Sequence, residues 1–457
     1  NIYESIYKNA VTGSIVIADE GNQIARMSIQ GLERIAFHLK TPGVSYGKED
    51  VVDASEETGE PYHIYNISDR KQINQGIMQY TLHFASREFM RNIRTKVSQA
   101  YDGKHDRAVI DIMKDKDYLD SRKKLHYEPT GNANKIVVPN LSPFEAINMI
   151  AKKSVADKSK GVGYYFYETT GGYYFRSWQS MITNQGEFAR PPRQQFYYQP
   201  LKMSSDGNAT KQDKIEREFE SVEEYEFVTN FHDVASNTIL GTYGHRVISH
   251  DLFNKSYDIA DYNFHNEYRR TPHTDTVKDA KNKFPISNTP VDYDNRDNVS
   301  NYAESRVSLQ TTAPFLHDKD VGKYGLEPLQ DGLKTGQAVS QSNQVAHGTA
   351  LLLTVKGQSY LQAGDLITFN LADVNSANTE NPNDPRFSGN YIITKIRHHV
   401  TKDQYRMILE CAKDSVATSY GELGDGYNGA DAGFAMNIHT ANKSELELEE
   451  IDSDIGY

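Results

Sequence analysis

The chain has 457 residues, a formal net charge of −12 and a mean hydropathy of −0.68. This length predicts roughly two to four domains with real cores, and the acidic balance argues against a protein that grips nucleic-acid phosphates. The single cysteine, Cys411, excludes a disulfide framework and a cysteine-based zinc site.

Targeting signals are the next feature to consider. We recognise no signal peptide and no apolar run long enough to span a membrane, so we expect no membrane anchor. Because the chain begins at Asn1 and not at Met, we expect its start to be processed or missing. We interpret the chain as soluble, made inside the cell and without redox chemistry. Its 30 tyrosines suit sheets and subunit interfaces.

The first 60 residues predict short strands and turns. Ser14–Ala18 is a short apolar run, and a turn around Gly21 separates it from a second run at 27–39 that Gly31 interrupts. Residues 41–60 are rich in glycine, proline and acids, which is typical of a loop.

Residues 62–103 change their period. Met78–Phe84 alternates apolar and polar side chains, which predicts a half-buried strand. From Ser86 onward the apolar spacing is helical, so we expect a helix from Ser86 as N-cap to Gly103. Its solvent face is expected to carry these basic residues: Arg87, Arg91, Arg94 and Lys96. A short helix follows at 105–116, and we close a first, β-rich domain at 1–128.

The next segment, 129–210, predicts a small α+β domain. Ser142 followed by Pro143 and Glu145 is a strong helix start, with a capping box and proline in the first turn. Two aromatic runs then flank Gly171 and Gly172, which is typical of a hairpin.

The rest of the chain returns to strands. We expect strands at 225–231, 238–248, 351–355, 365–369, 391–396 and 404–411, with a hairpin turn at 401–403. Residues 271–305 have almost no periodicity and predict a long irregular insertion. The domain assignment is therefore a second β domain from 211–255 plus 345–415, an inserted irregular domain at 256–344, and an acidic extension at 416–457.

No residue pattern points to catalysis, a cofactor or a metal. His398 and His399 are adjacent on a predicted strand, so they point to opposite faces and cannot easily share one ion. Gly161 and Gly163 lack a third glycine and a following helix signal, which argues against a nucleotide loop. Cys411 lies on an alternating strand and is expected to be a buried, small apolar residue. We expect no enzyme activity.

The C-terminal extension offers one candidate binding segment. Its acidic residues alternate with apolar ones, so it is either a solvated tail or an arm that becomes ordered on a partner. The candidate partner-binding residues are Glu445, Leu446, Glu447, Leu448, Glu449, Glu450 and Ile451.

Several stretches, taken in order, resemble one known family. They are MSIQGLERIAFHLKTPG at 27–43, MQYTLHFASREFMRNIRTKVSQAYDG at 78–103, LSPFEAINMIAKKS from 141 with YYFYETTGGYYFRSW from 164, YLQAGDLITFNL at 360–371, FSGNYIITKIRHHV at 387–400 and YRMILECAK after it. The family is that of the central baseplate hub proteins of contractile-tailed bacteriophages, which are related to the trunk of type VI secretion spike proteins. The resemblance is weakest at 255–345 and after 416.

The resemblance implies a mainly β fold, with two similar antiparallel β-barrel domains and two peripheral domains, one of them α+β. It implies a homotrimeric structural protein of the virion baseplate, assembled in the host cytoplasm, that adapts a sixfold tail tube to a threefold central spike. The expected partners are the spike below, tail-tube or tube-initiator proteins above, and baseplate wedge proteins. DNA would pass through without being bound, so we expect a neutral or negative channel wall that excludes the Arg87–Lys96 cluster.

Two other functions stay open from the sequence. The first is a tail-associated cell-wall hydrolase, which would need a catalytic motif or a separate lytic domain. The second is a carbohydrate-binding β protein, which the single Trp178 disfavours but the many tyrosines leave possible.

Overall fold

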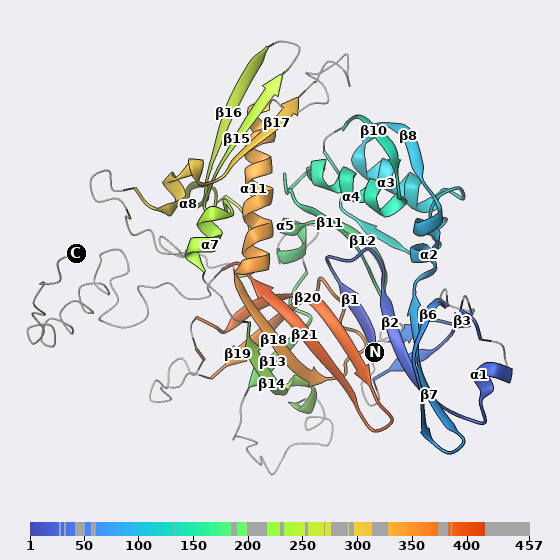
Figure 1. Ribbon diagram of the computed structural model, residues 1–457. Coiled ribbons are helices and arrows are strands. Elements are labelled where there is room, and N and C mark those ends of the chain that lie inside the picture. Colours follow the sequence, from blue (N-terminus) through green and yellow to red (C-terminus); the bar gives the residue numbers. More distant parts are fainter. Residues whose placement is uncertain are drawn as a thin grey trace, which may run out of the picture.

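The structure is a computed structural model (Figure 1). It describes residues 1–26, 29–31, 33–41, 51–55, 61–131, 133–183, 190–198, 217–228, 233–251, 255–268, 270–275, 291, 297–312, 328–372, 383–384 and 386–415. The candidate binding segment at 445–451 lies outside these residues.

The first half of the molecule is a curved antiparallel sheet. Its elements are β1 (Ile2–Ser5), β2 (Thr12–Glu20), α1 (Gln23–Arg26), β3 (Arg34–Ile35), β4 (His38–Lys40), β5 (Val51–Asp53), β6 (Tyr62–Asn74) and β7 (Ile77–Ala85). The predicted alternation at 78–84 is confirmed, since Tyr80, Leu82 and Phe84 are buried on one face of β7. The small β4–β5 sheet packs over this face, with Val52 and Ala54 in the same core.

An α+β unit follows. Its elements are α2 (Arg87–Arg94), β8 (Val97–Lys104), α3 (His105–Lys114), β9 (Leu125–Tyr127), β10 (Ala133–Leu141), α4 (Pro143–Lys153), β11 (Tyr164–Thr169), β12 (Gly172–Ser177) and α5 (Trp178–Ile182). The hairpin, the helix at 105 and the helix after Ser142 are confirmed. The expected helix from Ser86 to Gly103 is wrong in its second half: it stops at Arg94, and β8 pairs with β10 instead.

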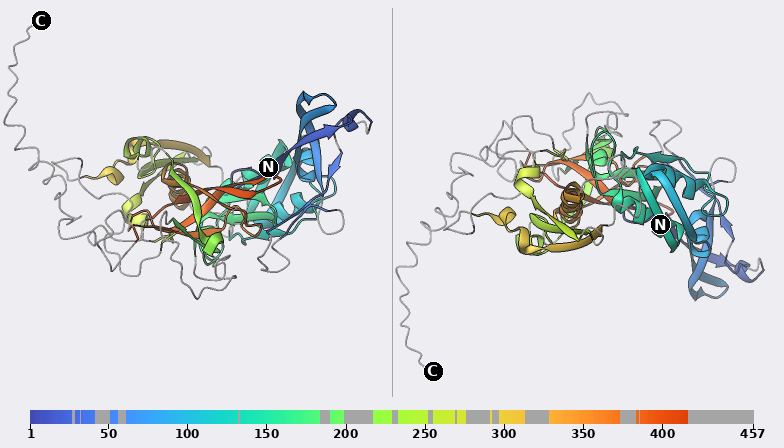
Figure 2. Two further views of the ribbon diagram at one scale, coloured as in Figure 1. Left: turned by 90° about the horizontal axis from the view of Figure 1, so that it is seen from below. Right: turned by 90° about the horizontal axis from the view of Figure 1, so that it is seen from above.

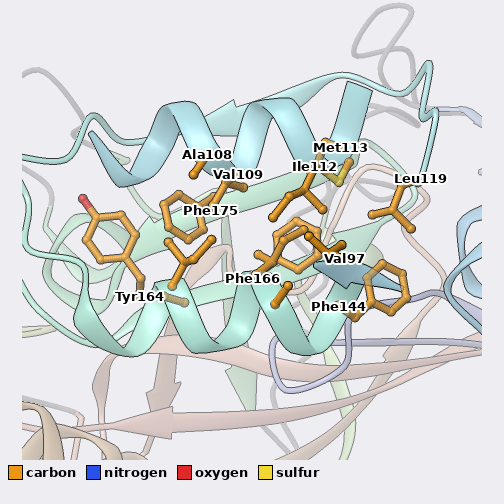
Figure 3. Packing of buried hydrophobic residues seen from close by; sticks show 14 of the residues in the cluster. Val97, Ala108, Val109, Ile112, Met113, Leu119, Phe144, Tyr164, Phe166 and Phe175 are labelled. Atoms are coloured by element: carbon orange, nitrogen blue, oxygen red, sulfur yellow. The ribbon is translucent and has the colours of Figure 1, made fainter. Parts of the chain in front are cut away.

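The reason for this early stop lies in the residues at 95–101. Thr95 and Val97 are β-branched, which disfavours helix, and Val97 and Tyr101 fill a core that only a strand reaches. In this core α3 and α4 cover β11 and β12, with Ile112, Phe144 and Phe175 between them (Figure 3). The core unites residues from both sides of the expected domain boundary at 128.

The second half is a strand set that turns back on itself. Its strands are β13 (Gln194–Tyr198), β14 (Val222–Phe227), β18 (Thr349–Lys356), β19 (Leu366–Leu371), β20 (Gly389–Val400) and β21 (Tyr405–Lys413). They pair in the order β14–β18–β21–β20–β19–β13. An isolated bridge between Tyr197 and Ser221 then brings the ends together around one core that includes Phe369 and Cys411.

The N-terminal strand joins the two halves. β1 pairs with β2 on one side and with β20 on the other, so that one eleven-stranded sheet runs through the molecule. Figure 2 shows the two halves side by side along the length of the molecule, with the N-terminus where they meet. The expectation of a mainly β fold is confirmed, and the two expected barrels are two halves of one sheet.

A peripheral sheet occupies the region that was expected to be irregular. The elements are α7 (Val234–Ile239), β15 (Gly244–Asp251), β16 (Ser256–Asn263), α8 (Phe264–Tyr268), η2 (Val299–Asn301), η3 (Ala303–Ser305), β17 (Val307–Thr312) and α11 (Pro328–His347). The irregular domain expected at 256–344 is therefore wrong where β16, β17 and α11 lie, whereas the described residues of 271–305 hold only the short η2 and η3. The strand expected from 238 starts only at Gly244.

Glycines on α11 explain its close packing on this sheet. A Cβ at Gly332 would lie 2.7 Å from the Cβ of Ala260, and one at Gly336 would lie 2.7 Å from the Cβ of Tyr262. The helix has few large apolar residues, so its sequence lacks the apolar stripe that predicts an amphipathic helix.

Candidate assembly surfaces

The long sheet presents one continuous exposed face. Because paired residues point to the same side of a sheet, the registers β7–β2–β1–β20–β21 place one set of side chains on this face. The set is Gln79, His83, Ser14, Val16, Ala18, Tyr3, Lys395, Arg397, His399, Arg406, Ile408 and Glu410; Thr81 points to the same side but is buried. The opposite face packs on the cores of the two halves. Polar side chains therefore dominate the exposed face.

Charges on this face are mostly compensated within the second half. Lys395 lies 2.8 Å from Glu410, and Arg406 lies 2.9 Å from Glu223. The guanidinium of Arg397 lies over the ring of Tyr3, 6.0 Å from its centroid. The part of the face on β2 and β7 carries no charged residue between Ser14 and Ala18 or between Gln79 and His83. The face therefore carries three basic residues, of which Lys395 and Arg406 have a carboxylate partner and Arg397 lies over a tyrosine ring.

Glu4 stabilises the junction at β1, where the two halves of the sheet meet. Its buried carboxylate accepts the backbone N–H of Thr170 at 2.9 Å and that of Ala363 at 3.0 Å, and lies 3.8 Å from His398. Burial alone would raise the pKa of Glu4, but His398 and the two N–H groups hold it below its ordinary value. One side chain therefore ties together β1, the β11–β12 turn and the second half.

A buried charge cluster joins the first half to the α+β unit. Lys123 contacts Glu168, and its ammonium lies 3.4 Å from Glu88. Burial raises the pKa of Glu168 despite the lysine, whereas Lys123 and Ser121 keep the pKa of Glu88 below its ordinary value against the effect of burial. Glu168 also accepts the backbone N–H of Val11 at 2.8 Å. Two carboxylates thus depend on one cation at this junction.

A third cluster holds the end of β21, where the described chain stops. Asp414 accepts the backbone N–H of Thr274 at 2.9 Å and lies 2.9 Å from His273. Lys413 is buried and lies 3.3 Å from Asp275. Burial would raise the pKa of Asp414, but His273 and Thr274 hold it below its ordinary value. The exit of the C-terminal extension is therefore fixed beside the peripheral sheet.

Chemistry-bearing residues are not gathered into a metal or catalytic site in the described part of the chain. No group of three or more His, Cys, Asp or Glu that could hold a metal is found there. His398 is buried while His399 is on the exposed face, as their adjacent positions predicted, and Cys411 is buried. Within the described residues, no helix is long and apolar enough to cross a membrane.

Two residues of the predicted basic cluster at Arg87–Lys96 make contacts within the chain. Arg87 pairs with Asp120 at 2.8 Å, and Arg91 donates to the carbonyl oxygen of Tyr118 at 2.8 Å. These two arginines thus tie α2 to the loop at 115–120. The sequence did not reveal this role, because it depends on a loop about 30 residues away.

Comparisons with known proteins give the following. No protein-family model matches the sequence, and no curated protein matches it significantly. Among solved structures, the 43 kDa tail protein of prophage MuSo2 from Shewanella oneidensis matches with a TM-score of 0.47 and 9% identity, over 90% of this chain and 93% of that one. A tail protein from Neisseria meningitidis MC58 matches with a TM-score of 0.46 and 11% identity, over 94% and 93%.

A third match comes from type VI secretion. It is an E. coli component of that system, described as structurally similar to the phage T4 tail proteins gp27 and gp5. Its TM-score is 0.41 and its identity 8%, over 92% of this chain and 74% of that one. The chain resembles phage tail and type VI secretion proteins. This is a likeness of overall fold and assigns no role to any residue.

Proposed function

We propose that this chain is a structural protein of a phage tail, the trimeric central hub of a contractile-tail baseplate. The observation that carries the proposal is the single sheet that β1 creates between two strand-built halves. Such a protomer supplies two similar wall segments, so three copies supply six, which suits an adaptor between a sixfold tube and a threefold spike. The ordered sequence motifs at 27–43, 78–103 and 360–400 point the same way.

Exposed aromatic residues on the strands support an assembly. Tyr7 and Tyr65 are 45% and 42% exposed. Tyrosine is enriched in interfaces because its ring packs while its hydroxyl stays hydrated. An obligate trimer interface of this kind would bury well above ~2,000 Å² in total.

The exposed face of the long sheet is our choice for the channel wall. DNA carries one negative charge per ~1.7 Å of axis, so a strongly basic wall would bind it and slow its passage. A face with few basic residues, most of them paired with carboxylates, and with hydroxyl, amide and imidazole groups stays wet and holds DNA weakly. Compensated charges such as Lys395–Glu410 act only within the Debye length of about 8 Å at physiological salt.

Partners follow from this position in the tail. We propose a central spike protein on one side of the ring, tail-tube or tube-initiator proteins on the other, and baseplate wedge proteins outside. Residues 445–451 are proposed as an interaction segment. The location would be the virion baseplate, after assembly in the host cytoplasm. The five domains assigned from the sequence remain part of the proposal.

We further propose that the chain has no hydrolytic activity of its own. The carbohydrate-binding alternative is disfavoured, because Trp178, the only tryptophan, is 1% exposed and cannot stack on a sugar. Clearing of purified peptidoglycan by the isolated chain, abolished by replacing one carboxylate, would contradict this proposal.

Sedimentation of the purified chain tests the trimer. The expected species has three times the chain mass of 51.7 kDa and persists at micromolar concentration and moderate salt. A chain that stays monomeric at every concentration would refute the hub. Tyr7→Ser together with Tyr65→Ser is expected to weaken the trimer, whereas replacing Tyr257, which is more exposed and lies on the peripheral sheet, is the control.

A further inference from the structure

One strand of the peripheral sheet has an open edge. The sheet has the order β16–β15–β17, so no described strand pairs with the outer edge of β17. β17 has the sequence VSLQTT, without a charge or a proline. Natural proteins usually protect such edges with charged residues, proline or a covering segment, because the unpaired backbone groups recruit another strand. Among the described residues, this edge therefore lacks the usual protection against pairing with another strand.

The two faces of the sheet differ at this edge. On the outer face, Ile248 is in register with Ile259 on one side and with Leu309 on the other. Ile259 and Leu309 are 46% and 68% exposed, and Val307, next on this face, is 51% exposed. A strand that pairs with β17 would place every second side chain beside this apolar row.

Beneath the inner face at the same edge lies a lysine of α11, Lys334. The Thr335 hydroxyl of α11 donates to the side chain of Gln310 at 3.5 Å, which places this part of the helix beside β17. The neighbouring Lys334 donates to the carbonyl oxygen of Lys160 at 3.0 Å. Burial, with the charge of Lys160, lowers the pKa of Lys334 against the effect of Glu267. The position of its ammonium beside the edge complements a carboxylate on an added strand. The remaining side chains of the added strand should therefore be acidic.

The chain carries a segment with this pattern. Residues 445–451 read Glu-Leu-Glu-Leu-Glu-Glu-Ile, in which Leu446 and Leu448 alternate with Glu445, Glu447 and Glu449. As a strand, this segment would have an apolar face and an acidic face. The described chain ends at Ser415, which bonds to Thr274 beside the peripheral sheet. About 30 residues separate Ser415 from the segment, and a flexible linker of that length spans roughly 30 Å on average.

We propose that residues 445–451 of this chain add as a strand to the outer edge of β17. Leu446 and Leu448 then extend the apolar row beside Val307 and Leu309, and the glutamates lie on the side of Lys334. The pairing occurs within one chain and requires neither a trimer nor a spike, so it stands independently of the proposed hub.

Thiol cross-linking in the full chain tests the pairing. Cys411 is fully buried, so exposed cysteines introduced elsewhere react selectively. The test variant is Thr311→Cys with Leu448→Cys, treated with a short bifunctional maleimide. The matched control is Val16→Cys with Leu448→Cys, since Val16 is 57% exposed on a different sheet.

We expect an intrachain cross-link in the test variant and little in the control. Equal cross-linking in both, or none in either, overturns the proposal. A cross-link between two chains also overturns it, because the strand would then come from a second copy.

Hydrogen exchange provides a second readout that needs no cysteine. Leu446→Ser with Leu448→Ser should speed exchange of the amides on the outer edge of β17 by at least about tenfold. Ile455→Ser, outside the segment, is the control and should leave these amides unchanged. Exchange that is the same in all three proteins refutes the pairing, and so does β17 protection that depends on an added partner protein.

Discussion

Replacing Lys123 by methionine is the most informative perturbation of the junction between the first half and the α+β unit. Methionine keeps the length of the side chain and removes its charge. It leaves Glu88 and Glu168 buried, at 0% and 1% side-chain exposure, without their shared cation. The loss should therefore be electrostatic more than steric.

The magnitude follows from the geometry. At the 3.4 Å separation of Lys123 and Glu88, the attraction is about 5 kcal/mol with an effective dielectric constant near 20. Part of this offsets the desolvation of the groups. Breaking a buried pair by removing one partner typically costs about 3–5 kcal/mol. We expect Lys123→Met to lower the free energy of unfolding by about that amount at pH 8.

The loss of stability in Lys123→Met should depend on pH in a characteristic way. Without Lys123, burial raises the folded-state pKa of both carboxyls above their unfolded values near 4.5. A raised carboxyl pKa destabilises the folded state progressively as pH rises through that window. The penalty should therefore be large at pH 8 and smaller at pH 5.

Urea unfolding followed by the fluorescence of the buried Trp178 measures the effect at both pH values. Lys124→Met is the matched control, since Lys124 is the exposed neighbour in the sequence. If Lys123→Met behaves like Lys124→Met, or loses the same stability at pH 5 as at pH 8, the electrostatic account of this junction is wrong.

Three further substitutions test other contacts by the same unfolding assay. Glu4→Ala leaves two buried N–H groups unsatisfied and should cost roughly 2–5 kcal/mol near neutral pH. Because the folded pKa of Glu4 is lowered, this difference should shrink as the pH falls below about 4.5; an equal loss from the exposed Glu20→Ala would contradict this role of Glu4 at the junction. Gly336→Ala should destabilise by about 1–3 kcal/mol by crowding Tyr262, and a gain in stability, as at an exposed helix position, would disprove the close packing. Ser142→Ala should cost about 1 kcal/mol through lost capping of α4, and an unchanged midpoint would show that the cap is dispensable.

The sequence predicted the elements whose signals are local. Ser142 and Glu145 form their expected contact, with the Ser142 backbone N–H donating to the Glu145 carboxylate at 2.9 Å. The strand alternation at 78–84 and the hairpin at 164–177 are likewise encoded within a few residues. These features depend on capping, period and turn chemistry, which a short window contains.

Features set by distant contacts were missed. The helical spacing after Ser86 was misleading because Val97 and Tyr101 serve the strand β8 and a core made with α3 and α4. α11 was missed because it packs on the sheet through small residues, and its sequence has no stripe of large apolar residues that would predict an amphipathic helix. The strand pairing of β1 with β20, in which Tyr3 lies opposite Arg397, joins opposite ends of the chain. No local sequence pattern predicts it. The open edge of β17 depends equally on tertiary pairing.

An electron cryomicroscopy map of the purified chain tests the hub proposal most directly. The account predicts a threefold ring of three chains whose channel is lined by the exposed face of the long sheet, with Val16 and Lys395 on the wall and the Arg87–Lys96 cluster elsewhere. The wall should carry little net charge, because Glu410 and Glu223 lie beside two of its basic residues. A monomer, a ring that turns this face outward, or a channel lined mainly by arginine and lysine would contradict the account.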